Sequence, residues 1–374
     1  MTFVSKNAGN TKYKVDLSEG KYRSRRDGLL NILFHASELP NDLFVEMNLS
    51  YDYYRKLISD LLRLGLIKRV SQDGMAGYQL TLKGKNLTKT KINYLKYRPC
   101  VEEETDRHYT AKRRRRKRNF SYLYALFDRV GIITYEVFAK PSIQDVDVNG
   151  DKIYFYTALE FKRMIGIEAT PFKGSKLLGF MIGKGKIISV YRSGFWMPVF
   201  GKHEKWIPEY VQRYFSTPLT TAIMICCSDS AVIHLFTQII EGKSYDKKSV
   251  NTAGYKDFII LQSDDDSFLS HLNDLYIDHI DTEQRLIERY RIDTSDKDAN
   301  HRTRFLFGTG FIDDDPVLIC AGNVNAVKLK YFVLNAGKTS RLSYILCRYR
   351  DLSVLQKITE GYPVKVLTIS PFDD

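Results

Sequence analysis

One stretch, SYDYYRKLISDLLRLGLIKR at residues 50–69, decides the fold that we expect for the first third of the chain. Ser50 can accept hydrogen bonds from the free N–H groups of a helix that starts at residue 51, and Gly65 is a typical helix end. Between them, apolar side chains recur at the i, i+3, i+4, i+7 spacing of a single buried helix face. The stretch therefore predicts a helix over residues 51–64. Its expected buried residues are Tyr54, Leu57, Ile58 and Leu61.

The flanking residues predict two helices before this one and a hairpin after it. Residues 25–36 carry an apolar stripe close to a helical period, and residues 43–47 form a second short apolar segment after a break at Pro40. Beyond Gly65, residues 66–71 and 78–82 favour antiparallel strands with a turn between them. The expected order is three helices and then a hairpin.

This order resembles that of winged helix-turn-helix domains. Residues 50–58 resemble the recognition helix of that family, residues 61–69 its exit into the first wing strand, and residues 77–84 its second wing strand entering a helix. In such domains the recognition helix enters the major groove and the wing touches the adjacent backbone. The resemblance implies double-stranded DNA as a partner. It implies contacts from Tyr51, Tyr53, Arg55 and Lys56 of the helix and from Lys68 and Arg69 of the wing.

The net charge of +13 is concentrated in the same third of the chain. The first 118 residues hold 26 Lys and Arg against 13 Asp and Glu, whereas the remaining residues hold 31 of each kind. A basic third joined to a neutral remainder indicates a module that binds a polyanion, most often nucleic acid, beside a domain with another role. The alternative is a winged helix that docks a protein, with its charges only solvating a helix face.

Seven consecutive cations follow this region, at residues 112–118. No amphipathic pattern crosses them, which predicts a solvated linker over residues 99–119. The tract either pairs with the acidic residues 102–106 or grips the phosphates of DNA. A nuclear-import signal is a further interpretation that requires a eukaryotic cell. The expected phosphate clamp consists of Lys112, Arg113, Arg114, Arg115, Arg116, Lys117 and Arg118.

The C-terminal two-thirds alternates strand and helix patterns. Residues 176–182 and 186–191 favour a hairpin, and residues 221–227 favour a buried strand that Ser228 caps into a helix. Similar steps follow near residues 260 and 320, so a largely parallel or mixed sheet covered by helices is expected. The predicted fold class is multi-domain α/β. Its parts are a winged helix at residues 20–98, the linker at 99–119 and an α/β domain at 120–374.

The amino-acid composition excludes several classes of protein. The chain is 44% hydrophobic and 13% aromatic, which excludes a disordered regulator, and no run approaches the roughly 18 to 20 apolar residues of a membrane span. The first residues lack a secretory pattern, and five cysteines without a CxxC pair favour reduced thiols. We therefore expect a soluble cytoplasmic protein with no membrane partner. No phosphate-binding loop or metal-ligand spacing is present, so no cofactor or metal is predicted.

An acidic constellation leaves an enzyme open as an alternative. Metal-dependent nucleases place an Asp on one strand and a Glu-x-Lys motif on the next, and Asp147 or Asp151 before Glu160 and Lys162 fits superficially. However, Thr157 and Glu160 stand in capping-box register, which places Glu160 in the first turn of a helix. Without this site, no catalytic residue is predicted.

The whole chain resembles, in its architecture, the replication-relaxation proteins of plasmids and other mobile elements of Gram-positive bacteria. The resemblance rests on the order of the three parts and on residues 175–179, 189–194 and 196–204. It implies a DNA-binding protein that acts in replication, DNA relaxation or mobilisation, or in their control, with replication or mobilisation proteins as partners. No catalytic residue can be carried over. A ligand-responsive transcription regulator is a further interpretation, and a homodimer is the expected state of a winged-helix binder.

Overall fold

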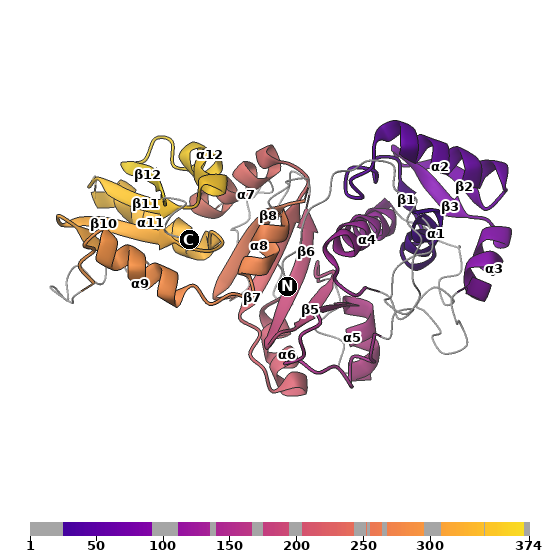
Figure 1. The fold of residues 1–374 in the computed structure, drawn as a ribbon, viewed down its shortest axis with the longest axis horizontal. Coiled ribbons are helices and arrows are strands. Elements are labelled where there is room, and N and C mark those ends of the chain that lie inside the picture. The colour runs from indigo at the N-terminus through magenta and orange to yellow at the C-terminus, as the bar shows by residue number, and fades with distance from the viewer. Residues whose placement is uncertain are drawn as a thin grey trace. The chain divides into compact units, whose positions relative to one another are not determined.

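The chain forms two compact units, Met1–Val146 and Asp147–Asp374, in a computed structural model. The structure describes residues 25–91, 111–134, 140–166, 175–193, 204–242, 252, 255–263, 268–294, 308–339 and 341–369. Figure 1 labels their helices and strands. Both units combine helices with sheets, and both sheets of the second unit are mixed, which confirms the predicted multi-domain α/β class.

The first unit is built on α1 (Arg25–Ala36), which is buried along most of its length. The chain then forms β1 (Leu39–Pro40) and a series of turns over residues 41–48. The short helix predicted at residues 43–47 is wrong. The turns close on Pro40 and Asp42 and stop at Asn48, which has a φ of 50°, so the segment is too short to propagate a helix.

The next helix, α2 (Tyr51–Arg63), has the predicted cap and the predicted buried face. The Ser50 hydroxyl accepts from the Tyr53 N–H at 3.3 Å, and the expected residues Tyr54, Leu57, Ile58 and Leu61 are buried. The Tyr54 hydroxyl also donates to the Pro40 carbonyl at 3.0 Å. This bond ties the buried face of α2 to β1.

A hairpin follows, made of β2 (Ile67–Gln72) and β3 (Met75–Leu80), and α3 (Leu82–Lys91) comes after it. The turn is shorter than predicted because Asp73 and Gly74 both adopt positive φ, the geometry of a two-residue hairpin turn. The sheet order is β1-β3-β2, so the unpredicted strand β1 covers the free edge of β3.

The basic tract lies in a helix rather than in a linker. Helix α4 (Ala111–Val130) contains residues 112–118 and contacts α1 and β1 (Figure 1). Its later residues Leu123, Leu126 and Phe127 are fully buried. The predicted linker is therefore wrong at residues 111–119. The second unit starts at Asp147 instead of residue 120, because α4 contributes to the core of the first unit.

The second unit contains a five-stranded sheet in the order β4-β5-β6-β7-β8. The pairs β4–β5 and β5–β6 are antiparallel, and the pairs β6–β7 and β7–β8 are parallel. The predicted hairpin is β5–β6, and the predicted buried strand is β7. The bounds are β4 (Tyr154–Thr157), β5 (Gly179–Gly183), β6 (Lys186–Ser193), β7 (Thr221–Cys226) and β8 (Asp257–Gln262).

Helices surround this sheet and connect its strands. Ser228 caps the crossover helix between β7 and β8 as predicted: its hydroxyl accepts from the Ala231 N–H at 3.3 Å. The bounds are α5 (Ala158–Ile165), η6 (Glu204–Trp206), α6 (Ile207–Phe215), α7 (Asp229–Glu241), α8 (Phe268–Asp274) and α9 (Ile280–Arg289).

A second sheet, in the order β12-β11-β10-β9, completes this unit. Its strands β10, β11 and β12 are parallel, and β9 is antiparallel to β10. Helix α7 contacts α11 and α12, and α11 contacts β8, so helices join the two sheets. The bounds are β9 (Gly310–Ile312), β10 (Asp315–Cys320), α11 (Ala326–Thr339), β11 (Ser343–Cys347), α12 (Tyr349–Ile358) and β12 (Val364–Thr368).

Candidate functional site

The solvent-facing side of α2 presents aromatic and basic side chains together. Tyr51 and Tyr53 are 58% and 42% exposed, and Arg55 and Lys56 are exposed beside them. The Tyr51 ring also packs edge-on against Phe44, with 5.5 Å between the ring centroids. The four residues predicted on this helix therefore lie at the surface, and Tyr51 is held in place by a neighbouring ring.

Acidic residues of the same helix reduce its positive charge only in part. Arg63 is paired with Asp60 at 3.1 Å, although its side chain stays 80% exposed, so this cation is only partly offset. Asp52 is exposed in the first turn of α2, where a carboxylate is favoured by the helix dipole. Arg55 and Lys56 are thus the cations of the exposed face that a polyanion would meet.

The predicted wing residues do not share one surface. Lys68 and Arg69 are both exposed in β2, opposite Gln79 and Tyr78 of β3. Successive side chains of a strand point to opposite faces of the sheet, so Lys68 and Arg69 lie on opposite faces of the hairpin. Both are exposed, but a ligand bound to one face would contact only one of them.

A buried ion pair joins the basic tract to Glu38. Arg114 Nε donates to Glu38 Oε2 at 2.9 Å, and Arg114 Nη2 donates to Glu38 Oε1 at 2.7 Å, in a bidentate pair. Both side chains are buried, with exposed fractions of 2% and 0%. Arg114 also donates to the carbonyls of Gln72 and Met75, at 2.5 and 3.1 Å. These carbonyls flank the turn of the hairpin.

Arg118 reinforces the same contact one helical turn further along α4. Its Nη1 donates to the Ala76 carbonyl at 2.7 Å and to Glu38 Oε1 at 3.3 Å. Residues four apart lie on one face of a helix, so Arg114 and Arg118 reach Glu38 and the hairpin together. We call Arg114, Arg118 and Glu38 the wing anchor.

The predicted solvated clamp is therefore wrong for Arg114, which is buried, and for Arg118, whose side chain is only 15% exposed. Both guanidinium groups share the Glu38 carboxylate and donate to backbone carbonyls of the hairpin. Arg115 is exposed, whereas Lys117 and Arg116 are half-buried, with Arg116 placed 5.9 Å from the ring centroid of Phe120. The side chains of Lys112 and Arg113 lie outside the described residues. Sequence reasoning missed the anchor, because Glu38 lies 76 residues before Arg114 and every residue of the tract is a cation.

The nuclease constellation is not assembled in the second unit. Glu160 lies in the first turn of α5, and its Oε2 accepts from the Thr157 N–H at 2.6 Å, while the Glu160 N–H donates to the Thr157 hydroxyl at 3.2 Å. This is the capping box expected from the sequence. Asp147 accepts from the Asn149 N–H at 2.9 Å in the turn before β4, and Asp151 is exposed there. Lys162 is half-buried on the same helix as Glu160.

The capping box predicts a stability effect for Glu160 in place of a catalytic one. We expect Thr157→Ala with Glu160→Ala to lower the free energy of unfolding of the second unit by about 1–2 kcal/mol, because two N–H groups of α5 lose their acceptors. Chemical denaturation monitored by Trp fluorescence measures this unit. Glu209→Ala, in the first turn of α6 without such a box, is the control. Full stability in the double variant would contradict the assignment.

Acidic and histidine side chains elsewhere do not form a metal centre. In the described ranges, no three or more His, Cys, Asp or Glu side chains gather closely enough to hold a metal ion. His271 and Asp274 lie in α8, whereas Asp278 and His279 lie between the end of α8 and the start of α9. None of the described helices is both long enough and apolar enough to cross a bilayer.

Comparison of the chain with protein-family models, with curated proteins and with solved structures finds no match. A functional proposal therefore rests on the structure itself, on the exposed side of α2, the hairpin and the wing anchor.

Proposed function

We propose that the first unit is a winged-helix DNA-binding domain, with α2 as its recognition helix and β2–β3 as its wing. The observation that carries the proposal is the solvent-facing side of α2, where Tyr51, Tyr53, Arg55 and Lys56 are all exposed. Arg and Lys bind phosphates and base edges, and Tyr hydroxyls hydrogen-bond phosphate oxygens.

The wing anchor supports this proposal. A wing that touches the DNA backbone has to keep its position relative to the recognition helix, since misplaced phosphate contacts lose their register. Guanidinium groups from α4 donate to three carbonyls around the hairpin turn, those of Gln72, Met75 and Ala76. The hairpin is thereby held at its tip as well as by its strand pairing.

The wider role in the proposal comes from the resemblance to replication-relaxation proteins. It assigns the DNA site to a bacterial plasmid or mobile element, where the protein acts in replication, DNA relaxation or mobilisation, or in their control. Replication or mobilisation proteins as partners, and a homodimer, stay predictions.

Binding of the full chain to a fluorescent duplex, measured by anisotropy over a series of salt concentrations, tests the proposal. We expect binding in about 50 mM salt that weakens steeply by about 200 mM, since each neutralised phosphate releases counterions and contributes about −0.9 to the slope of log K against log salt. Mg²⁺ in parallel samples shows any cleavage on a gel. Absence of binding at low salt would overturn the proposal and favour a module that docks an acidic protein.

A further inference from the structure

A pocket of about 330 Å³ lies in the second unit, where strands of both sheets end. Gln262 is the last residue of β8, Asn323 follows β10, and Asp351 lies in the first turn of α12 after β11. Asp229, at the start of α7 after β7, completes the rim. In open α/β sheets, ligands bind in crevices outside the carboxyl ends of the strands, and this volume suits a small organic molecule.

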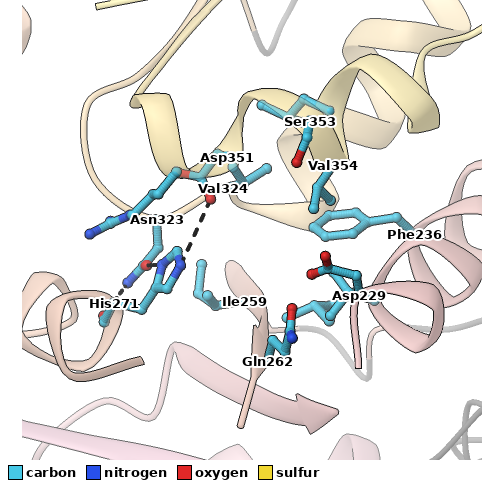
Figure 2. Close-up of a pocket in the computed structure, with 14 residues that line it drawn as sticks. Asp229, Phe236, Ile259, Gln262, His271, Asn323, Val324, Asp351, Ser353 and Val354 are labelled. Carbon is cyan, nitrogen blue, oxygen red and sulfur yellow. Dashed lines mark hydrogen bonds and ion pairs between the residues drawn. The ribbon is translucent and has the colours of Figure 1, made fainter. Parts of the chain in front are cut away.

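The pocket has an apolar wall and two polar sides. Figure 2 shows His271, Asn323 and Asp351 together on one side and Asp229 and Gln262 on the other. Apolar side chains line the space between them. They are Val232, Phe236, Ile259, Val324, Val354 and Leu355.

The ring of His271 is oriented by two hydrogen bonds with one side chain. The Asn323 amide nitrogen donates to the His271 carbonyl at 2.7 Å, so the Asn323 oxygen is left to accept from His271 Nδ1 at 2.7 Å. The neutral ring then carries its proton on Nδ1, and Nε2 is an acceptor. Nε2 lies 4.0 Å from Asp351 Oδ1, too far for a hydrogen bond, and faces it across the pocket side (Figure 2).

Asp351 brings a second acceptor to the same place. Its side chain is 12% exposed, with Oδ1 facing His271. Its buried Oδ2 lies 3.6 Å from Arg350 Nε, in an ion pair. Burial raises the pKa of Asp351, while the neighbouring Arg350 guanidinium opposes that rise. Asp351 Oδ1 and His271 Nε2 are therefore two acceptors on one side of the pocket, where a ligand that brings donors would be favoured.

The one arginine that lines the pocket is already engaged. Arg350 Nη1 donates to the Ser270 hydroxyl at 2.5 Å, and Arg350 Nη2 is bound to Asp274. Arg348 holds the same carboxylate, with Nη1 at 3.3 Å from Asp274 Oδ2. An anionic ligand would therefore meet the carboxylates of Asp351 and Asp229, while both Nη groups of Arg350 are already bound to Ser270 and Asp274.

We propose that this pocket binds a small organic amine in its protonated form, with the ammonium between Asp351 and His271 and its hydrocarbon body against Phe236. An ammonium has three donors and no acceptor, which matches Asp351 Oδ1 and His271 Nε2 facing each other at 4.0 Å, and its charge matches the carboxylates. The Phe236 ring face also favours a cation or an apolar group. This ligand site goes beyond the proposed binding of DNA.

Isothermal titration of the full wild-type chain with probes of matched shape and opposite charge tests whether the pocket prefers a cationic or an anionic ligand. The amine probes are phenethylamine and putrescine, and their anionic counterparts are 3-phenylpropionate and succinate. We expect at least one amine to bind in a one-to-one ratio and to raise the melting temperature, while its carboxylate counterpart does neither. Binding of the carboxylates as tightly as the amines, or no binding of either amine, would overturn the proposal.

Two variants then place the amine in the pocket. Asp351→Asn keeps the shape and removes the charge, so we expect the Kd of the bound amine to rise about tenfold or more. Asp281→Asn, an exposed carboxylate in the first turn of α9, is the matched control and should leave Kd unchanged. Ser353→Trp at the exposed rim blocks the pocket without entering the core, and it should abolish binding even where Asp351→Asn folds poorly. Unchanged Kd in either pocket variant would contradict the site.

Discussion

Arg114→Ala is expected to lower the free energy of unfolding of the first unit by about 3–5 kcal/mol, the cost of removing one partner of a buried ion pair. The variant leaves the Glu38 carboxylate, which has no exposed surface, with Arg118 at 3.3 Å as its remaining guanidinium partner. It also removes the donors to the Gln72 and Met75 carbonyls. Since single domains are stable by only about 5–15 kcal/mol, this loss is a large share of the total.

Hydrogen exchange of the full chain measures this effect in the right unit. The two units need not unfold together, so one melting curve would mix them. Amides of β2 and β3 should exchange faster in Arg114→Ala, whereas those of β7 and β8 should keep their wild-type rates. The neighbouring variant Arg115→Ala removes an exposed cation from the same helix and is the control, with a change within about 0.5 kcal/mol.

A double variant separates the ion pair from the rest of the contact. Arg114→Met with Glu38→Leu removes both charges and keeps apolar volume, so we expect it to be more stable than Arg114→Ala, as replaced buried ion pairs often are. Wild-type protection of β2 and β3 in Arg114→Ala would contradict the wing anchor. Neutralising residues 113–116 together would not be a clean test of phosphate contacts by the basic tract. The change would include Arg114 and so would also disturb the wing.

Arg55→Ala with Lys56→Ala is expected to produce the largest loss of DNA binding that leaves the fold intact. If both cations contact phosphates, the slope of log K against log salt falls in magnitude by about 2, roughly one for each residue. A base contact by either side chain would add a loss of about 1–3 kcal/mol at its preferred sequence. Both side chains are exposed on α2, so the variant should melt like the wild type.

Anisotropy titrations at several salt concentrations measure this slope. The control is Lys328→Ala with Lys357→Ala, which removes two exposed cations from α11 and α12 of the second unit and so changes net charge equally. Equal slopes for the wild type, the α2 variant and this control would mean that α2 does not face the DNA. Arg115→Ala, tested alongside, shows whether the exposed part of the basic tract adds a contact of its own.

Local patterns predicted much of both units. Ser50 and the apolar spacing of α2, the capping box of Thr157 and Glu160, and the Ser228 cap all act within a few residues, and the structure contains each of them. The exposed helix residues of the candidate DNA site could be read from the same periodicity. The turns at residues 41–48 were not predicted, because an apolar composition alone does not distinguish a short helix from linked turns.

The burial of part of the basic tract depends on tertiary structure. Seven consecutive cations predict a solvated segment unless the fold places a carboxylate beside them. Glu38 lies 76 residues before Arg114, so the local sequence gives no sign of this contact. The pocket is similar, since His271 meets Asn323 across 52 residues and Asp351 comes from a third element. The caps and most of the helices and strands could be predicted from the sequence, because they depend on neighbours along the chain. Which charges are buried and which acceptors converge depends on the packing of elements that lie far apart in the sequence, so these features required the folded structure.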